Sequence, residues 1–573
     1  MEKLMQAADK PSTDPVSPDF DVVIVGAGIG GLYSLYKLRS LGFRVHCVEA
    51  AESVGGTWYW NRYPGARCDI ESLQYSYSFD EKLQQEWEWS ERFAAQPEIL
   101  RYLDHVADRF DLKRNISFNT WVAGADFDEA GHFWSVKINN GSTISARFCI
   151  MATGALSAPR KGMFEGEDRF KGEIYHTALW PHTNPDLTGK RVGIIGTSAS
   201  GTQAVPHLAR QASHLTVYQR TANFSIPSRI GPVDPAEVAE QKANYSAIRA
   251  EQRRSTTGAV FELPHCGALE VDEKEREAIY ERRWTIGGLS FLRSFNDLFT
   301  NDEANATAVA FVHNKLREKV KDQETAEKLL PRSHAIGARR ICTDYGYYEA
   351  FNRDNVSLVD ILADPIVQIT EKGIRTESGE IELDVIVMAT GFNTMVGALT
   401  QIDIRGRGGE LLRDKWQDGP KSYLGMVMAG FPNLLTQAGP LTPGTLGMFY
   451  MLNEQQGNWI ADLLVHMRDN DIIEVEATSE AEVEWVQHIQ DIAKHTLHYK
   501  TPESSYFFYG TDGNRVFLVF IGGFNVYSDI CKKVAGEDYK GLIMRAAGGV
   551  NQGQAPSPLF RESDGSKVAT VFE

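Results

Sequence analysis

The sequence predicts an α/β fold with two nested Rossmann-like dinucleotide-binding domains and a helical insertion. Three observations support this prediction: a strand, glycine turn and helix near the start of the chain, a second copy of that pattern further along, and two strand-ending Ala-Thr-Gly turns. One such turn follows each glycine pattern, so one dinucleotide domain is expected to interrupt the other. A chain of 573 residues is also too long for one hydrophobic core, which agrees with several packed units.

The first glycine pattern begins with the apolar run FDVVIV, residues 20–25, which is too short for a helix and predicts a strand. Three glycines follow it, each with its own mechanical role. Gly26 would make the tight turn, Gly28 would let the backbone approach a pyrophosphate, and Gly31 would let the helix pack on the strand. Such a pattern alone is often an ordinary turn, but a strand before it and a helix after it favour a nucleotide site.

The second glycine pattern reads RVGIIGTSASGTQAVPHLA from Arg191 onward. Gly196 and Gly201 stand at its outer positions, and Ser198 stands at the middle one. Serine leaves the closest backbone approach less free than glycine would, but it is small enough to permit that approach. The pattern therefore predicts a second nucleotide site.

The residue after the next strand distinguishes the two sites. In the first site the strand from Arg44 to Val48 is followed by Glu49, whose carboxylate suits the hydroxyls of an unphosphorylated ribose. In the second site the strand from Leu215 to Tyr218 is followed by Gln219 and then Arg220, which suits a 2′-phosphate and predicts NADP(H). The alternative for this arginine is an ordinary solvated surface residue.

The two Ala-Thr-Gly turns, ending at Gly154 and Gly391, mark where the chain crosses between domains. The segment from Pro235 to Arg332 is rich in Glu, Lys, Arg and Ala, which predicts a helical insertion. The chain should then return to the first domain and end in an apolar strand, Val516 to Ile521. The expected division is a disordered tail 1–20, a first domain 21–155 plus 390–542, a second domain 156–234 plus 333–389, the insertion 235–332 and a C-terminal tail 543–573.

Composition limits the partners and the compartment. The 59 basic and 76 acidic side chains give a net charge of −17, whereas nucleic-acid binding needs a surplus of clustered cations, so no nucleic-acid partner is expected. No apolar run approaches the roughly 18–20 residues that cross a bilayer, so no membrane insertion is expected. The six cysteines form no CxxC pair and no zinc-ligand spacing, which predicts free thiols, no metal site and a cytoplasmic protein. A monomer and a homo-oligomer both remain open.

Two longer strings bear on the chemistry. GGTWYWNRYPGARCD, from Gly55 to Asp69, and FKGEIYHTALWP, from Phe170 to Pro181, resemble the two signatures of the type I Baeyer–Villiger monooxygenases, the flavoproteins of the phenylacetone and cyclohexanone monooxygenase type. The related N- and S-oxidising flavin monooxygenases carry a string similar to the second one without its terminal Trp-Pro. The resemblance extends from about Asp21 to Leu542.

This resemblance implies FAD in the first domain, NADPH in the second and a reaction with O2. Enzymes of this family insert one oxygen atom next to a ketone carbonyl, giving an ester or lactone through a peroxyflavin and a tetrahedral adduct. A flavin-dependent S- or N-oxygenase with the same cofactors is the alternative, and a flavin-binding redox sensor or scaffold is a third hypothesis. A disulfide reductase would need a redox cysteine pair, and the sequence has none.

The family pattern also implies the site residues. Arg340 matches the catalytic arginine, and Asp69 matches the acid that pairs with it. A guanidinium group keeps its proton, so it can stabilise both a peroxide anion and the oxyanion of the adduct. Arg339 stands in place of a lysine that helps to hold the 2′-phosphate. The expected cofactor-binding residues are Gly26, Gly28, Gly31, Glu49, Thr57, Trp58, Asp69, Tyr75, Val122, Gly196, Thr197, Ser198, Ala199, Ser200, Gly201, Gln203, Arg220, Thr221, Arg339 and Arg340.

Further positions carry more specific expectations. Trp58 is the aromatic residue that we place against the flavin, and His176 is expected to be structural, at an interdomain hinge, rather than a proton shuttle. In the C-terminal loop, an ungapped match puts Ser504 where many relatives have an active-site tryptophan, whereas a small shift would put Tyr506 there. Leu446 and Phe449 would make the substrate pocket apolar.

Overall fold

The structure is a computed structural model that describes residues 17–500, 505–510, 515–547 and 549–551. Most of the expected N-terminal tail, and also Ser504, lie outside the described residues.

The first sheet has eight strands and is assembled from two distant parts of the chain. Its strands are β1 (Phe20–Val25), β2 (Val45–Val48), β3 (Ile116–Ser117), β4 (Val122–Asp128), β5 (Phe133–Ile138), β6 (Thr143–Met151), β17 (Asp403–Arg405) and β18 (Leu434–Thr436). They run in the order β17-β4-β5-β6-β1-β2-β3, and β18 also pairs with β6. β1 is parallel to β2 and β6, whereas β4, β5 and β6 are antiparallel neighbours. The chain therefore leaves this sheet after β6 and returns to it with β17.

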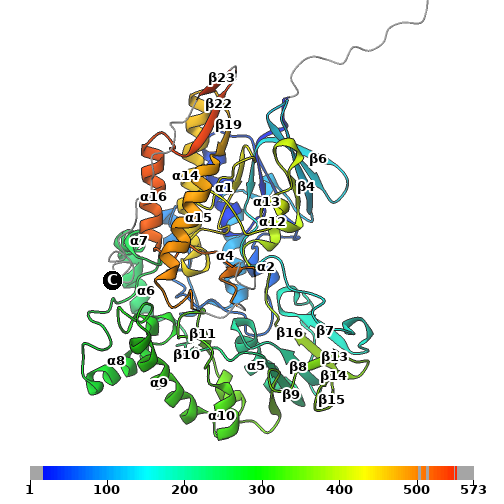
Figure 1. Ribbon diagram of the computed structural model, residues 1–573, viewed down its shortest axis with the longest axis vertical. Coiled ribbons are helices and arrows are strands. Elements are labelled where there is room, and N and C mark those ends of the chain that lie inside the picture. The colour runs from blue at the N-terminus through cyan, green and yellow to red at the C-terminus, as the bar shows by residue number, and fades with distance from the viewer. Residues whose placement is uncertain (1–16, 501–504, 511–514, 548, 552–573) are drawn as a thin grey trace, which may run out of the picture.

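The apolar run that predicted β1 forms the centre of this unit. Val22, Val23 and Ile24 are completely buried. The glycine turn leads into α1 (Ile29–Ser40), which packs against β1, β2 and the long helix α14 (Phe449–Asp469). Figure 1 shows α1 and α14 together in the upper part of the molecule.

The second sheet is parallel throughout and lies entirely within the interruption of the first. Its order is β12-β9-β8-β16-β7. The bounds are β7 (Glu173–His176), β8 (Arg191–Ile195), β9 (His214–Gln219), β12 (Val356–Asp360) and β16 (Val385–Met388), with α5 (Ala199–Gln211) following β8. This arrangement confirms the predicted fold class, because one Rossmann-like sheet is inserted into another.

The expected helical insertion contains five helices, which divide between the two hydrophobic cores. They are α6 (Pro235–Ala243), α7 (Tyr245–Arg254), α8 (Glu273–Ile286), α9 (Asp302–Lys319) and α10 (Gln323–Leu329), with the short 3₁₀ helix η4 (Gly288–Arg293) between α8 and α9. Tyr245 of α7 packs into the core of the first sheet, whereas Tyr280 of α8 and Phe311 of α9 pack into that of the second. Figure 1 shows α8, α9 and α10 in the lower part of the molecule, at the level of the second sheet, while α7 packs against α16 (Phe524–Gly536). The insertion is therefore not a separate unit with its own core.

The remaining elements connect or flank these units. The other helices are α2 (Thr57–Trp60), α3 (Glu81–Glu86), α4 (Gln96–Arg109), α11 (Tyr347–Ala350), α12 (Gly397–Gln401), α13 (Leu412–Lys415) and α15 (Ser479–Lys494), with the 3₁₀ turns η1 (Lys113–Asn115), η2 (Glu167–Arg169), η3 (Thr177–Leu179), η5 (Arg407–Gly409) and η6 (Gly444–Leu446). The small sheets contain β10 (Ser225–Pro227), β11 (Cys342–Asp344), β13 (Ile366–Ile369), β14 (Gly373–Thr376), β15 (Glu380–Glu382), β19 (Ile472–Ala477), β20 (Phe508–Tyr509), β21 (Val516–Phe517), β22 (Leu542–Ala546) and β23 (Gly549–Asn551).

Two expectations for the C-terminal part were wrong. The apolar run from Val516 to Ile521 forms only the two-residue strand β21, paired with β20, and its other residues pack as irregular backbone in the first core. The C-terminal tail was expected to begin at residue 543, but β22 extends to Ala546, paired with β19 and β23. Composition did not reveal β22, because its alternation of buried and half-buried residues extends over only a few positions.

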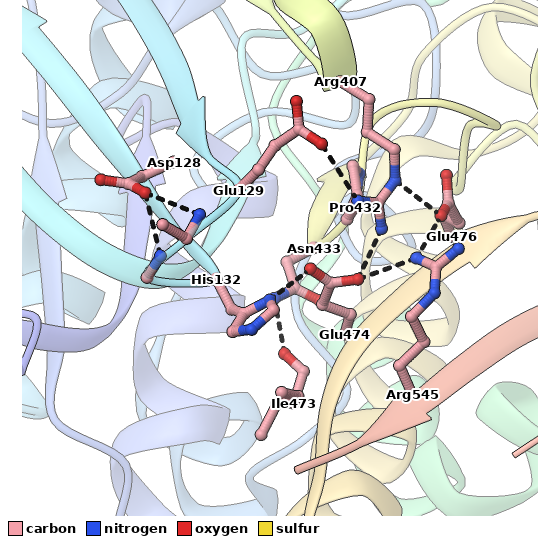
Figure 2. A network of polar contacts seen from close by, with 12 residues as sticks. Asp128, Glu129, His132, Arg407, Pro432, Asn433, Ile473, Glu474, Glu476 and Arg545 are labelled. Atoms are coloured by element: carbon pink, nitrogen blue, oxygen red, sulfur yellow. Dashed lines mark hydrogen bonds and ion pairs between the residues drawn. The ribbon is translucent and has the colours of Figure 1, made fainter. Parts of the chain in front are cut away.

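A buried ionic network joins this C-terminal sheet to the edge of the first sheet (Figure 2). Glu474 on β19 is only 2% exposed at its side chain. Its carboxylate contacts Nδ1 of His132, in the β4–β5 turn, at 2.6 Å, and it accepts from Arg545 of β22 at 2.8 Å. Arg407 of η5 donates to Glu474 at 2.5 Å and to the neighbouring Glu476 at 3.0 Å. Four separate segments of chain thus share one pair of carboxylates.

We expect Glu474→Gln to lower the unfolding free energy at pH 7 by about 2–3 kcal/mol, because two arginines lose a buried counter-charge. Burial alone would raise the pKa of Glu474, but His132, Arg545 and Arg407 outweigh it and lower the pKa. The stabilisation is therefore fully present above the ordinary carboxyl pKa of about 4.3 and is lost as the pH falls through the lowered value. Denaturation midpoints measured between pH 7 and pH 3 should show the wild type and the variant converging in acid.

Glu129→Gln is the matched control, since Glu129 contacts the same Arg407 at 3.6 Å but is 51% exposed. Its effect should stay within about 0.5 kcal/mol. A difference between wild type and Glu474→Gln that stays constant with pH would contradict an ionic contribution.

Candidate active site

The first glycine turn is a backbone cradle that side chains would fill. Gly26 has a φ of 105°, and a Cβ atom there would lie 2.6 Å from the carbonyl oxygen of Ala152. A Cβ on Gly31 would lie 1.8 Å from the oxygen of Gly26. Gly28 faces Gly56, where a Cβ atom would stand 2.9 Å from the Cα of Gly28. This geometry agrees with the turn, approach and packing roles that the sequence assigned to the three glycines.

The second glycine turn repeats the first. Gly196 has a φ of 111°, and a Cβ there would lie 2.4 Å from the carbonyl oxygen of Ala389. A Cβ on Gly201 would lie 2.0 Å from the oxygen of Gly196. Ala152 and Ala389 are the alanines of the two Ala-Thr-Gly turns, so each turn lies directly against its own glycine pattern. Ser198 precedes α5 in an extended conformation and makes no side-chain hydrogen bond to the helix, which leaves the helix N-terminus open to an anion.

Glu49 lies directly beside the first glycine turn. Its carboxylate accepts hydrogen bonds from the backbone N–H groups of Ala27, at 2.6 Å, and of Ala51, at 2.9 Å. Burial raises the pKa of Glu49, and these N–H groups hold back part of the rise. The side chain is thus fixed next to the backbone that would contact a dinucleotide. Val122 is the first residue of β4. Just before this strand, the backbone N–H of Thr120 donates to the backbone oxygen of Glu49.

The Gly55–Asp69 string joins the two domains. Its Trp58 packs in the first core and donates from Nε1 to the hydroxyl of Tyr75 at 3.1 Å. Its Tyr63 packs in the second core instead. Thr57 and Trp58 both lie on the short helix α2, which follows the glycine pair that faces Gly28. One signature string therefore reaches from the first nucleotide turn to the second domain.

Gln203 was expected to contact a cofactor, and in the structure its amide bridges the domains. Its Nε2 donates to the backbone oxygen of Arg67 at 3.1 Å, and its Oε1 accepts from the Tyr63 hydroxyl at 2.8 Å. Both partners belong to the Gly55–Asp69 string. A cofactor contact of Gln203 stays a prediction.

Three arginines gather at the second site. Burial and the charge of Arg220 lower the pKa of Arg160, and the same two causes lower the pKa of Arg339. Mutual repulsion of this kind is relieved by a bound anion, which fits the 2′-phosphate site predicted from Arg220 and Arg339. Sequence reasoning missed Arg160, although its place a few residues after the first Ala-Thr-Gly turn was a usable signal. Thr197 Oγ1 donates to the backbone oxygen of Thr221 at 3.2 Å, so the glycine turn and the arginine loop are joined directly.

Arg340 and Asp69 form a bidentate ion pair, as the family pattern implied. Arg340 Nε lies 2.6 Å from Asp69 Oδ2, and Nη2 lies 2.9 Å from Oδ1. A third nitrogen, Nη1, donates to the backbone oxygen of Thr445 at 2.5 Å. Burial alone would lower the pKa of Arg340, but the charge and hydrogen bonds of Asp69 outweigh it and raise the pKa. The guanidinium is therefore permanently charged and fixed in orientation.

Arg340 lines a largely apolar cavity of about 890 Å³, including its opening to solvent. Its lining residues come from the insertion and from the C-terminal part of the first unit, together with Ile70, Gly337 and Arg340. Leu446 lines it, as expected, but Phe449 does not. Its wall includes Ile70, Phe261, Leu289, Leu292, Phe299, Pro443, Met448, Phe520, Ile521 and Phe524, with Thr256, Thr257, Arg293, His498 and Arg340 as the polar side chains.

Tyr506 lies within electrostatic reach of Arg340. Burial raises the pKa of Tyr506 to about 12, and the charge of Arg340 opposes this rise. Its ring also packs on Phe507 at a centroid distance of 4.5 Å. This placement of Tyr506 near Arg340 supports the shifted alignment, and Ser504 lies outside the described residues.

The two chain crossings between the domains run side by side. Arg160 N donates to Gly391 O at 3.0 Å, and Asn393 N donates to Ala158 O at 2.8 Å. The crossings thus form a short antiparallel ladder.

His176 lies on this ladder and has all of its ring nitrogens engaged. Nε2 lies 3.2 Å from both Arg160 O and Thr390 Oγ1, while Nδ1 accepts from the backbone N–H of Ala178 at 3.0 Å. Burial lowers its pKa, so the ring is neutral near pH 7. These contacts agree with the structural role that was expected for His176.

The residues present fit two dinucleotides. Each site offers a glycine cradle that a Cβ would fill, one with a buried acid and the other with converging cations. Within the part of the chain that the structure describes, no group of three or more His, Cys, Asp or Glu side chains is arranged to hold a metal ion. In the same residues, no helix is long and apolar enough to cross a membrane.

Comparison with known proteins gives consistent matches. Residues 23–260 match the family model of a pyridine nucleotide-disulphide oxidoreductase. A Baeyer-Villiger monooxygenase of Pseudooceanicola batsensis is 42% identical over 537 residues, which cover 93% of this chain and 97% of that protein. A phenazine N-monooxygenase of Lysobacter antibioticus is 41% identical over 539 residues, covering 92% of this chain and 97% of that protein. A crystal structure of OTEMO in complex with FAD and NADP is 38% identical, with a TM-score of 0.89, and covers 92% of this chain and 100% of that chain.

Proposed function

The chain belongs to the type I Baeyer–Villiger monooxygenases, and from this premise we propose that Arg340, held by Asp69, acts on ketones bound in the apolar cavity. The enzyme is an FAD- and NADPH-dependent Baeyer–Villiger monooxygenase. The observation that carries the proposal for the site is the bidentate ion pair on the wall of a cavity that is otherwise mostly apolar.

The arrangement leaves donors for a ketone oxygen. A guanidinium has five N–H groups, and Asp69 and Thr445 occupy three of those of Arg340. One N–H group on each Nη atom is left over. As the ketone oxygen gains negative charge during attack, a hydrogen bond from Arg340 to that oxygen becomes charge-assisted and strengthens. Asp69 fixes the guanidinium beforehand, so little reorganisation is needed when the charge develops.

When bound, NADPH would supply the electrons and FAD would activate O2, which is the source of the inserted oxygen atom. The part of this chain's own residues is to bind and orient the ketone and to exclude water. Apolar side chains such as Leu446, Phe520 and Phe524 serve the second purpose, because a dry wall strengthens the contact with Arg340.

The cofactors have distinct proposed positions. FAD would lie on the Gly26–Gly31 turn with its ribose toward Glu49, and Trp58 and Tyr75 would stand nearer the flavin. NADPH would lie on the Gly196–Gly201 turn with its 2′-phosphate among Arg160, Arg220 and Arg339. The domain boundaries proposed from the sequence follow the same division, except that the first unit continues through β22.

Oxidation of sulfur or nitrogen is a second candidate, and a phenazine N-monooxygenase is 41% identical to this chain. The terminal Trp180-Pro181 of the second signature favours ketones as the main substrates, because the related N- and S-oxidising enzymes lack this pair. Trp180 is buried in the second core, so its role would be to stabilise the fold around the site and not to contact the substrate.

A panel of cyclic, aliphatic, aryl and polycyclic ketones tests the proposal, with a thioether and a phenazine as competitors. We expect ketone-stimulated NADPH oxidation and a product with the mass of the ketone plus one oxygen atom. Oxidation of the thioether or the phenazine, with peroxide alone from every ketone, would favour the second candidate instead.

The remaining partners and the compartment are also part of the proposal. O2 is the co-substrate, and the protein acts as a monomer or a homo-oligomer in the cytoplasm. The cytoplasmic compartment is supported by the six cysteines, all of which are free thiols, five of them buried.

A further inference from the structure

The substrate cavity contains a second arginine that the proposed reaction does not use. Arg293 ends the 3₁₀ helix η4 and is 8% exposed. Its hydrogen bond goes from Nη2 to Thr256 Oγ1 at 3.2 Å, a neutral partner. Among the described residues, no carboxylate lies within ion-pair distance of Arg293. A buried cation without a counter-charge is costly, and so its position calls for a functional explanation.

Arg293 remains charged despite its burial. Burial and the nearby charge of Arg283 lower its pKa to about 10, which still leaves the guanidinium protonated at pH 7. Arg283 itself lies 3.5 Å from Glu262, a carboxylate that it shares with Arg282. Arg340 is balanced by Asp69.

His498, the third ionisable side chain of the cavity, does not balance the charge of Arg293 either. His498 is 2% exposed, and burial lowers its pKa to about 4, so it is neutral at pH 7. Neither ring nitrogen has a hydrogen-bond partner within the described part of the structure. The described residues of the cavity therefore carry one unbalanced positive charge, at Arg293.

Arg293 lies outside the arginine cluster of the proposed NADPH phosphate site. The charge of Arg220 lowers the pKa of Arg160 and of Arg339. The charge that lowers the pKa of Arg293 is instead that of Arg283. The two groups of cations are therefore separate. Because Arg293 lines the apolar cavity, a molecule bound in that cavity could supply its counter-charge.

We propose that the preferred substrates are ketones that carry a carboxylate, with the carbonyl oxygen at Arg340 and the carboxylate at Arg293. This inference rests on the proposed function and names its substrate class. The rest of the substrate contacts the apolar wall. A carboxylate would complete the hydrogen bonds of the Arg293 guanidinium, and the N–H group of His498 is a further donor in the same cavity.

Matched pairs of substrates test the inference on the holoenzyme. The probes are cyclohexanones with an acetate, propanoate or butanoate arm beside the carbonyl, each compared with its methyl ester and with cyclohexanone itself. For at least one arm length we expect kcat/KM for the carboxylate to exceed that for the ester by roughly 10- to 100-fold. In Arg293→Met this preference should disappear, and Arg293→Lys should restore part of it.

Arg254→Met is the matched control, because Arg254 is exposed at the end of α7, two residues before Thr256. It should keep the wild-type ratio of carboxylate to ester. A merely structural Arg293 would lower kcat/KM for both members of a pair equally, which would overturn the inference.

The other outcomes separate the two proposals. Equal kcat/KM for carboxylates and esters in the wild type overturns the substrate class and leaves the proposed function standing. Absence of oxygenated product from every ketone, cyclohexanone included, overturns the proposed function itself. If Arg293→Met does not fold, inhibition of wild-type cyclohexanone oxidation decides: cyclohexylpropanoate should inhibit at least tenfold more tightly than its neutral amide, and equal inhibition overturns the inference.

Discussion

Arg340→Ala should reduce ester formation by roughly 100- to 1,000-fold, the usual cost of removing a donor to a developing oxyanion. NADPH oxidation should continue, because Arg160, Arg220 and Arg339 are the residues proposed to hold the NADPH phosphate. The oxygen would then leave as peroxide instead of entering the ketone. Parallel assays of NADPH, peroxide and ester in one reaction measure the split directly.

Arg332→Ala controls for the loss of a nearby cation, since Arg332 is exposed and pairs with Glu327 on the surface. It should leave the ratio of ester to consumed NADPH at the wild-type value. Ester formation at the wild-type rate in Arg340→Ala would remove Arg340 from the role proposed here.

Arg220→Ala should weaken the use of NADPH by roughly 10- to 100-fold in kcat/KM, the range expected for a lost charge-assisted contact. The effect on NADH should be much smaller, because NADH lacks the 2′-phosphate. Loss of one cation should also relieve the repulsion on Arg160 and Arg339, so the site should stay folded. Steady-state kinetics with both dinucleotides give the comparison.

Arg210→Ala serves as the control for this prediction. Arg210 is exposed at the end of α5 in the same domain, away from the glycine turn at the start of that helix. An equal loss with NADPH and NADH in Arg220→Ala would contradict contact with the 2′-phosphate.

The parts of the site that depend on local backbone could be predicted from the sequence. Gly26 and Gly196 have positive φ and lie close to a carbonyl oxygen. Both conditions exclude a side chain, so each of these positions requires glycine and can be recognised in the sequence. Ala152 and Ala389, whose carbonyl oxygens face these glycines, could be recognised because the Ala-Thr-Gly turn occurs twice in the sequence. The pairing of Arg340 with Asp69, 271 residues apart, came from the family pattern and not from spacing.

The parts that depend on tertiary packing could not be predicted. Apart from its place shortly after the first Ala-Thr-Gly turn, nothing in the sequence marks Arg160 as a third cation of the proposed phosphate site, because Arg220 and Arg339 are distant in sequence. The same holds for Arg293, whose burial without a counter-charge is a property of the folded cavity. Likewise, the helical composition of the insertion was clear, whereas its division between two cores depends on which aromatic residues meet which sheet.

The discontinuous first sheet has a consequence for biosynthesis. Its β1 to β6 are complete by Met151, but β17 begins at Asp403, and at 5–20 residues per second roughly 10 to 50 seconds of translation separate them. All strands of the second sheet lie between, so this sheet can close while the first still exposes the unpaired edges of β4 and β6 on the ribosome. The unit synthesised first is thus the last to be finished. Truncated chains ending near residue 400 should therefore resist protease in the second sheet and be cleaved in the first.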